Sequence, residues 1–368
     1  MDPLTHSLVG AGLSRAGLHR TTPLATATLV IAANAPDIDV LVLVNGSYAG
    51  LAFRRGITHG PLALLVLPLF VTALVIGYDR TRARRTHDGG EAARAGPVLA
   101  LAALGVLTHA PLDWMNTYGI RLLSPLDPRW FYGDALFIID PWIWLMLAAV
   151  VVPHTSTRRG WIGWSALGAG VTALVLVTPE VPIVAKAAWT IGMAALVLQA
   201  VRANRRGTRP GEHHARFALA AAALYTGAMV VTGAVGRSVT AQAGRERGFD
   251  VGELMVAPAP ANPFAADIVV RTPHAYQLGE LSWIGPRVRW SDSIPLGPRD
   301  DVVIATLRLP QVRDFLRWSR FPYVEAAHDD QGRYVRWGDA RYPGRMRGGL
   351  SGVLVRVGPT PPTPRPSP

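Results

Sequence analysis

A histidine and an aspartate stand four residues apart at His109 and Asp113, where an apolar run ends. On a helix this spacing puts both side chains on one face, with Cβ atoms about 5–6 Å apart. An imidazole and a carboxylate so placed can supply ligands to Zn²⁺ or a similar ion. Because ionisable groups at the mouth of a membrane segment are costly, this pair indicates a functional site.

Two further histidines repeat the local pattern of His109. His6, His59 and His109 each follow a threonine, and each lies at the end of an apolar segment. Carboxylates expected on the same side of the membrane could join them in a mono- or dinuclear metal site for hydrolysis. Zn²⁺ suits these donors, with Mn²⁺ or Fe²⁺ as alternatives. The predicted ligands are His6, Asp37, His59, His109 and Asp113.

Other polar residues near these motifs are predicted to support the ligands. Asp37 and Asp39 are two residues apart and cannot share a helix face, so one can bind metal while the other orients a histidine. Asp39, Asp134 and Asp140 are candidates for orienting ligands or accepting a proton. Arg55, with Arg54, either holds an anionic group of a substrate or pairs with a site aspartate.

Simpler interpretations remain open for each motif taken alone. A histidine at a helix end is usually a hydrogen-bonded structural residue, and Asp37 beside Pro36 is ordinary turn chemistry. The alternative to an enzyme is a membrane protein in which the His/Asp set forms a structural network or an ion pathway. A pathway predicts carboxylates deep inside the spans, yet residues 161–178 and 217–235 contain none.

The composition indicates a membrane protein. The chain has 368 residues, of which 49% are hydrophobic and 17% charged. Arginine carries nearly all of the net charge of +12, since Lys186 is the only lysine. The arginines lie between apolar runs, where they set topology, so no nucleic-acid partner is expected. The absence of cysteine excludes disulfides and thiolate metal sites, and no cleavable signal peptide is expected.

The apolar runs predict a bundle of membrane helices. Basic loops at 79–97, 154–160 and 202–216 are predicted to be cytoplasmic. That orientation places the histidine motifs, and everything after about residue 236, on the extracytoplasmic side. Two shorter apolar segments, 4–18 and 23–33, are predicted to form a partly embedded hairpin. The predicted spans are 61–78, 97–112, 138–152, 161–178, 183–201 and 217–235.

The composition then divides the chain. Residues 1–240 are predicted to form a polytopic, mainly α membrane helical bundle that carries the metal site. Residues 249–357 show a soluble pattern and predict an extracytoplasmic α+β domain, and 358–368 is a proline-rich tail without packing capacity. In that domain the expected elements are strands at 267–272, 276–281, 302–307 and 334–337, and a helix at 311–319.

Several ordered motifs together resemble a known family, the YdjM-type inner-membrane-associated proteins described as LexA-regulated, metal-dependent hydrolases. The resemblance covers roughly residues 1–240 and implies a metal-dependent hydrolase in the inner (plasma) membrane. It does not specify a substrate. The segments that carry it are Thr5–Ser7, Asn34–Asp39, Arg54–His59, Thr108–Gly119 and Ile139–Trp142.

The same order of residues is also similar to the zinc-dependent phospholipase C and P1 nuclease group. On that resemblance the five predicted ligands match metal positions, and Asp113 can bridge two ions. That group uses further histidines and a glutamate downstream, whereas 114–150 contains neither. One or two ions are therefore expected. The resulting hypothesis is hydrolysis of a phosphoester or other ester of a lipid or envelope substrate, in contact with the lipid bilayer; the oligomeric state is open.

Overall fold

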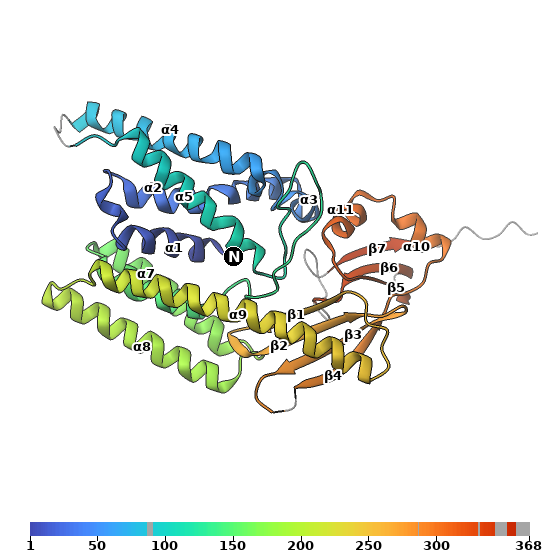
Figure 1. Ribbon diagram of the computed structural model, residues 1–368. Coiled ribbons are helices and arrows are strands. Elements are labelled where there is room, and N and C mark those ends of the chain that lie inside the picture. Colours follow the sequence, from blue (N-terminus) through green and yellow to red (C-terminus); the bar gives the residue numbers. More distant parts are fainter. Residues whose placement is uncertain (87–90, 286, 330–331, 343–351, 358–368) are drawn as a thin grey trace, which may run out of the picture.

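A computed structural model describes residues 1–86, 91–285, 287–329, 332–342 and 352–357. The first part of the chain is a bundle of helices, and the last part is a domain of two antiparallel sheets with two short helices (Figure 1). The predicted fold class is therefore confirmed. The proline-rich tail at 358–368 lies outside the described residues.

The helical part alternates long helices with short 3-10 segments, labelled η. The 3-10 segments are η1 (Leu18–Arg20), η2 (Ala35–Asn45), η3 (Ile57–His59) and η4 (Val152–His154). The α-helices are α1 (Pro3–Arg15), α2 (Ala25–Asn34), α3 (Ser47–Phe53), α4 (Pro61–Thr86), α5 (Ala95–Trp114), α6 (Pro141–Val151), α7 (Arg158–Val177), α8 (Ile183–Arg206) and α9 (Glu212–Glu246).

Six helical segments among the described residues are long and apolar enough to cross a membrane. Five of them correspond to predicted spans, and the sixth is Ala25–Asn45, where α2 continues directly into η2. The predicted span at 138–152 is instead a shorter apolar helix, Pro141–His154. The short hairpin prediction was right about pairing, since α1 packs along α2. The full set is Ala25–Asn45, Pro61–Arg82, Ala95–Trp114, Arg158–Val177, Ile183–Arg206 and Glu212–Glu246.

Two glycines let α1 and α5 approach α2 closely. A Cβ at Gly10 would lie 2.8 Å from the Leu29 carbonyl oxygen, and one at Gly105 would lie 3.1 Å from the same atom. Small residues at helix contacts are typical of membrane bundles. His6 is one turn before Gly10, and His109 is one turn after Gly105. Both histidines therefore lie on the faces that pack toward α2.

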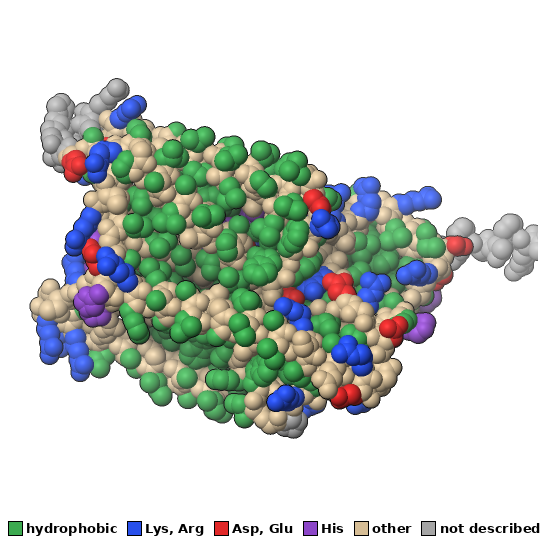
Figure 2. All heavy atoms as spheres, viewed as in Figure 1, with side chains coloured by type: hydrophobic (Ala, Val, Ile, Leu, Met, Phe, Trp, Pro, Cys, Tyr) green, Lys and Arg blue, Asp and Glu red, His purple; other side chains and the backbone are tan. Residues whose placement is uncertain are grey.

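The ends of several helices meet in a basic cluster far from these histidines. Arg20 Nε lies 2.7 Å from Glu212 Oε1, Arg216 Nε donates to the Ala16 carbonyl at 2.9 Å, and the Arg94 backbone N–H donates to Thr22 at 3.0 Å. In Figure 2 arginines gather at this left-hand end of the bundle, and an apolar surface covers the helices between it and the C-terminal domain. The predicted basic loops therefore share one end of the molecule.

The C-terminal domain follows α9, which extends beyond the bundle and packs on the first sheet through Val239 and Gly236. Both sheets are antiparallel meanders in the order of the chain. The first sheet contains β1 (Leu254–Ala259), β2 (Asn262–Arg271), β3 (Ala275–Ser282) and β4 (Val288–Pro295). The second contains β5 (Pro322–Asp329), β6 (Gly332–Asp339) and β7 (Val353–Val357); α10 (Asp301–Thr306) and α11 (Pro310–Trp318) precede it.

One element of this domain differs from its prediction. The β-branched run at 302–307 was expected to be a strand, but it forms α10. The Asp300 side chain caps the helix by accepting the Val303 backbone N–H at 2.9 Å. A capping aspartate satisfies an otherwise unpaired donor and so overrides the weak strand preference of valine and isoleucine. The other predicted strands and the helix at 311–319 are confirmed.

The C-terminal domain packs against the end of the bundle opposite the basic cluster. Trp318 of α11 lies with its ring centroid 5.3 Å from that of Tyr118. Trp130 Nε1 donates to the Arg317 carbonyl at 2.9 Å, and Arg341 donates to the Thr117 carbonyl at 2.5 Å. The loop after α5 is therefore held between the bundle and the domain.

Candidate metal centre

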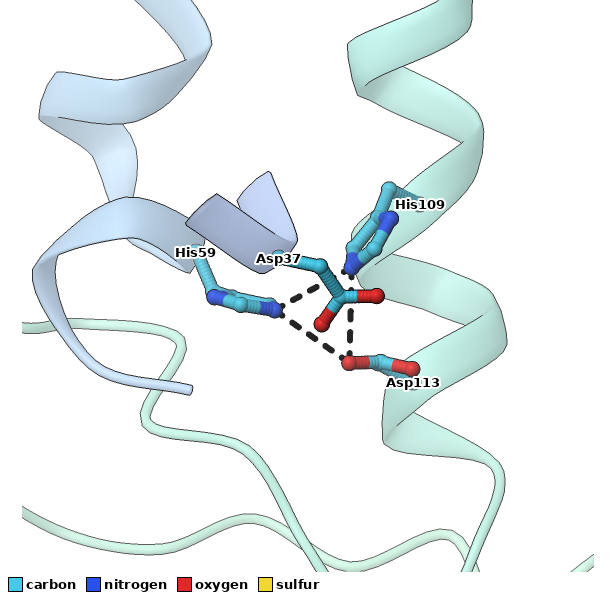
Figure 3. Close-up of side chains that lie close together, drawn as sticks. All are labelled: Asp37, His59, His109 and Asp113. Atoms are coloured by element: carbon cyan, nitrogen blue, oxygen red, sulfur yellow. Dashed lines mark hydrogen bonds and ion pairs between the residues drawn. The ribbon is translucent and has the colours of Figure 1, made fainter. Parts of the chain in front are cut away.

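Four side chains from three elements converge at the C-terminal end of α5. His109 and Asp113 come from α5, His59 ends η3, and Asp37 lies in the first turn of η2 (Figure 3). One potential ligand atom from each lies within 4.8 Å of the others. The sequence predicts these four residues as ligands, and the structure brings them close together.

The spacing of three of these atoms suits one metal ion. His59 Nε2 and His109 Nε2 are 3.1 Å apart, and they lie 3.3 and 3.4 Å from Asp113 Oδ2. Ligand atoms held about 2.0–2.1 Å from one tetrahedral ion are about 3.3–3.4 Å apart. All three side chains are fully buried. The spacing of the three potential ligand atoms therefore fits Zn²⁺ or an ion of similar size.

A backbone contact fixes the tautomer of His109. Its Nδ1 lies 2.6 Å from the Ala33 carbonyl oxygen at the end of α2. A carbonyl can only accept, so Nδ1 is assigned as the N–H donor. In the neutral ring Nε2 then carries a lone pair, which is aimed at His59 and Asp113.

Thr58 and Asp39 fix the tautomer of His59 in the same way. The Thr58 hydroxyl donates to Asp39 Oδ2 at 3.0 Å and lies 2.9 Å from His59 Nδ1. Because the hydroxyl proton is directed to the carboxylate, Nδ1 must donate to the hydroxyl oxygen. Burial lowers the pKa of His59, although Asp113 and Asp39 oppose the shift, and a lowered pKa favours the neutral ring. Its Nε2 therefore also carries a lone pair.

The result is a group of acceptors without a proton between them. The two Nε2 lone pairs face each other and the acceptor-only carboxylate oxygen of Asp113. Such an arrangement is repulsive in a buried site unless a cation is shared among the three atoms. The orientation of each histidine by its second nitrogen is the usual arrangement at metal sites.

His6 lies beside this group rather than within it. Its Nε2 is 3.3 Å from the other carboxylate oxygen, Asp113 Oδ1, and its ring stacks on that of His109 with centroids 3.8 Å apart. Its Nδ1 is buried without a hydrogen-bond partner among the described residues. The Met1 amino group also contacts Asp113 Oδ1. His6 thus approaches the side of Asp113 that faces away from His59.

Arg55 holds Asp113 in place. Its Nε lies 2.9 Å from Oδ2 and its Nη2 lies 3.2 Å from Oδ1 of Asp113. The remaining nitrogen donates to Asn116 at 2.8 Å, and the guanidinium lies over the Tyr118 ring at 4.6 Å. The Arg55 backbone, at a positive φ of 54°, donates its N–H to Asp39 Oδ2 at 2.7 Å. Of the two predicted roles, the structure shows the ion pair.

Asp37 and Arg54 form the outer edge of the site. Arg54 Nη2 lies 3.2 Å from Asp37 Oδ1, and Arg54 Nε lies 3.4 Å from Asp39 Oδ1. Both side chains keep some accessible surface, 13% for Asp37 and 27% for Arg54. Asp39 accepts from three neighbouring groups, the Arg54 side chain, the Arg55 backbone N–H and the Thr58 hydroxyl, and it contacts His59 through Thr58.

Asp134 and Asp140 are not brought into the group. Asp134 pairs with Arg320 of the C-terminal domain at 2.8 Å. Asp140 caps α6 by accepting the Trp142 and Ile143 backbone N–H groups, and it accepts the Tyr225 hydroxyl at 2.9 Å. Both carboxylates were predicted as candidates for catalysis. Asp134 instead connects the bundle to the C-terminal domain, and Asp140 connects α6 to α9.

Sequence reasoning missed three residues that shape the site: Thr58, Asn116 and Tyr118. Thr58 had a usable signal, because it directly precedes a predicted ligand and a hydroxyl there can bond a ring nitrogen. Asn116 and Tyr118 lie within the Thr108–Gly119 motif, but their partner Arg55 is about sixty positions away. Asn116 also accepts the Tyr118 backbone N–H at 2.9 Å, which fixes the turn that holds Arg55.

A comparison with known families now places the chain. A profile of the YdjM inner membrane protein family matches residues 1–235. The chain belongs to this family. With six candidate spans, this YdjM family member is a multi-pass inner membrane protein. The match contains the complete His/Asp group and ends within α9, before the two sheets.

Two other comparisons returned nothing. No curated protein and no solved structure matches the chain. The second resemblance, to the zinc-dependent phospholipase C and P1 nuclease group, is not supported by any of the comparisons.

Proposed function

We propose that this YdjM family member is a metal-dependent hydrolase that cleaves a phosphoester or other ester of a lipid or envelope substrate. The observation that carries the proposal is the convergence of three buried acceptor atoms, His59 Nε2, His109 Nε2 and Asp113 Oδ2, at metal-ligand spacing. A bound Zn²⁺, Mn²⁺ or Fe²⁺ would supply Lewis acidity that activates water and polarises the scissile group.

Each neighbouring residue has a distinct proposed task. His59, His109 and Asp113 hold the ion, and Asp37 completes the set from the exposed side. Asp39 is a positioning residue rather than a base, because its oxygens already accept from Arg55, Thr58 and Arg54.

Arg55 and His6 are assigned to Asp113. Arg55 fixes the orientation of the Asp113 carboxylate from the protein side and balances its charge. His6 lies at the second oxygen of Asp113 and would help to hold a second ion if one binds there. Asp134 and Asp140 are assigned structural roles.

The alternative is a non-enzymatic membrane protein with a structural network or an ion pathway. A structural network pairs donors with acceptors, whereas here two lone pairs face each other. A pathway needs polar groups along the spans, whereas the His/Asp group lies at one end of α5. These features favour a site at the membrane surface.

Metal analysis of the purified chain tests the proposal. The native chain is expected to retain close to one or two equivalents of a divalent metal and to hydrolyse a p-nitrophenyl phosphodiester. His109→Ala and Asp113→Ala should lose both properties. His154→Ala is the matched control, because His154 donates to its own helix at Val150 and lies by the basic cluster. A native chain without metal, or variants that keep it, would contradict the proposal.

We also propose that the site and the C-terminal domain face the extracytoplasmic side. The basic cluster at the opposite end supports this orientation. Because the chain has no cysteine, single replacements report the sidedness directly. In intact cells, a membrane-impermeant maleimide should label Ser293→Cys in β4 and not Thr208→Cys between α8 and α9. The reverse labelling would overturn the orientation.

A further inference from the structure

The metal group opens to the surface on one edge. His59, His109 and Asp113 are fully buried, and Arg55 is nearly so. Asp37 and Arg54 are the members of this neighbourhood with clear surface exposure. A substrate that reaches the group must therefore pass the Asp37–Arg54 edge.

Apolar side chains frame that edge. They come from η2, the end of α3, η3 and the start of α4, and each is between 48 and 64% exposed. We call them the apolar rim: Ile38, Leu41, Phe53, Ile57 and Leu62. A water-filled entrance is normally lined by polar groups, so this rim indicates contact with a nonpolar phase.

The rim continues into the surface that faces the bilayer. Leu65, Leu69 and Leu74 follow Leu62 along α4 and are each more than half exposed. α4 is one of the candidate spans, with a mean hydropathy of 2.3 over its apolar window. The hydrocarbon that covers α4 therefore also reaches the rim.

The opposite side of the site is covered by the C-terminal domain. Tyr118, which lies over Arg55, is buried against Trp318 and Phe315 of α11. The same cluster includes Leu51 of α3, so α11 also covers that helix. Access from the aqueous side is thus closed at this point of the fold.

Arg54 supplies the chemistry that a phosphate requires. Its contacts to Asp37 and Asp39 are long, at 3.2 and 3.4 Å, and its guanidinium remains partly exposed beside the metal group. A guanidinium fork matches two oxygens of a phosphate.

We propose that the substrate is a phosphate-bearing membrane lipid that enters sideways from the bilayer. Its phosphate contacts Arg54 beside the metal group, and its acyl chains lie on the apolar rim. This inference rests on the proposed hydrolase for turnover, but binding at the rim does not depend on it. Moving one CH₂ group from hydrocarbon to water costs about 0.8 kcal/mol, so a sideways route avoids the large cost of extracting a long chain.

Lipid binding can be measured without turnover. The full chain carrying Ile57→Cys, labelled with bimane, would be held in dodecyl maltoside micelles and titrated with phosphatidic acid bearing a nitroxide on one acyl chain. Leu174→Cys on α7 is the matched control, since its side chain is similarly exposed on another candidate span. Saturable quenching is expected at position 57 and only weak, non-saturating quenching at position 174.

Arg54→Gln, and in parallel Arg54→Lys, sharpen the test. Both variants should weaken quenching at position 57, Arg54→Gln by about tenfold in the midpoint, equivalent to about 1.4 kcal/mol. An excess of water-soluble dibutyryl phosphatidic acid should compete poorly, because its short chains leave the rim uncovered.

Equal quenching at both positions, or equal competition by the short-chain compound, would overturn the proposal. The latter result would indicate a water-soluble phosphoester instead. Failure of the two proposals can be told apart. If the lipid quenches the label at position 57 but the protein shows no hydrolytic activity, the hydrolase proposal is rejected and the lipid site remains. If the protein is hydrolytically active but quenching is not selective for position 57, only the proposal of lateral entry from the bilayer is rejected.

Discussion

Two buried carboxylates, Asp113 and Asp339, have opposite surroundings. Both are fully buried and both contact an arginine. Asp339 accepts from Arg341, Ser319 and the Arg320 backbone, so each oxygen meets at least two donors. Asp113 meets two imidazole lone pairs at the oxygen that also contacts Arg55.

This difference distinguishes a buried carboxylate that stabilises the fold from one that is available to bind a ligand. The Asp339 pair is satisfied within the C-terminal domain and holds the connection between α11 and the end of β6. Oδ1 of Asp113 is satisfied by Arg55 and the Met1 amino group, but at Oδ2 two of the three nearest neighbours have no proton to donate. A buried charge is retained at such a cost where it serves a ligand. The comparison predicts that perturbing Asp339 changes stability and perturbing the Asp113 group changes metal binding.

The largest expected effect is on stability, from Arg341→Ala. Removing one partner of a buried ion pair leaves the other charge uncompensated, at a cost of about 3–5 kcal/mol. The free energy of unfolding in detergent measures it. Arg333→Ala is the control, because its ion pair with Asp300 is partly exposed and should be worth about 1 kcal/mol or less. Equal effects of the two variants would show that the Asp339 pair is not a structural connection.

A smaller effect, on metal affinity, is expected from Thr58→Val. The change removes the hydroxyl between Asp39 and His59, and loss of a group that orients a metal-binding histidine typically costs 10- to 100-fold, or about 1.4–2.7 kcal/mol. Thr108→Val is matched to it, since Thr108 also precedes a ligand but donates to Gly105 of its own helix. Titration with Zn²⁺ should separate the two variants. Indistinguishable affinities would argue against the assigned tautomer of His59.

The third effect depends on pH. Burial alone would raise the pKa of Asp339, but Arg341 outweighs it and the pKa is lowered. A carboxylate with a lowered pKa stabilises the fold above the unfolded value of 3.8 and loses that contribution as the pH falls through the folded value. Between pH 4 and 3 the native chain should lose up to about 1.4 kcal/mol per pH unit from this group, and Asp339→Asn should lack that slope. If the free energy of unfolding of the native chain and of Asp339→Asn depends on pH in the same way, this contribution of Asp339 is excluded.

Much of the metal group could be predicted because its signals are local. The four-residue spacing of His109 and Asp113 and the repeated Thr-His dipeptide point directly to residues that the structure brings together, and the loop charges place them at one end of the bundle. Asp134 was assigned to the site by sidedness alone, since its partner Arg320 is 186 residues away. Asp140 did carry a local signal, because Asp-Pro at the start of an apolar run is a helix-capping pattern.

The first membrane span shows a different limit of prediction from sequence, which concerns its length. The sequence predicts that residues 23–33 are too short to cross, because the polar segment Asn34–Asp39 ends the apolar run. The structure continues the segment through η2 to Asn45, where the polar groups turn inward to Arg54, Arg55 and Thr58. Hydropathy cannot anticipate partners that come from later in the chain. In the C-terminal domain, likewise, the strands are signalled locally but the packing of α11 on the bundle depends on long-range contacts.

X-ray absorption at the edge of the bound metal tests the central claim most directly. The chain purified with its metal should show two imidazole ligands and oxygen ligands at about 2.0–2.2 Å, whereas His109→Ala should retain no metal to give a spectrum. A spectrum with oxygen ligands alone, unchanged by that substitution, would contradict the assignment of His59, His109 and Asp113 as a metal site.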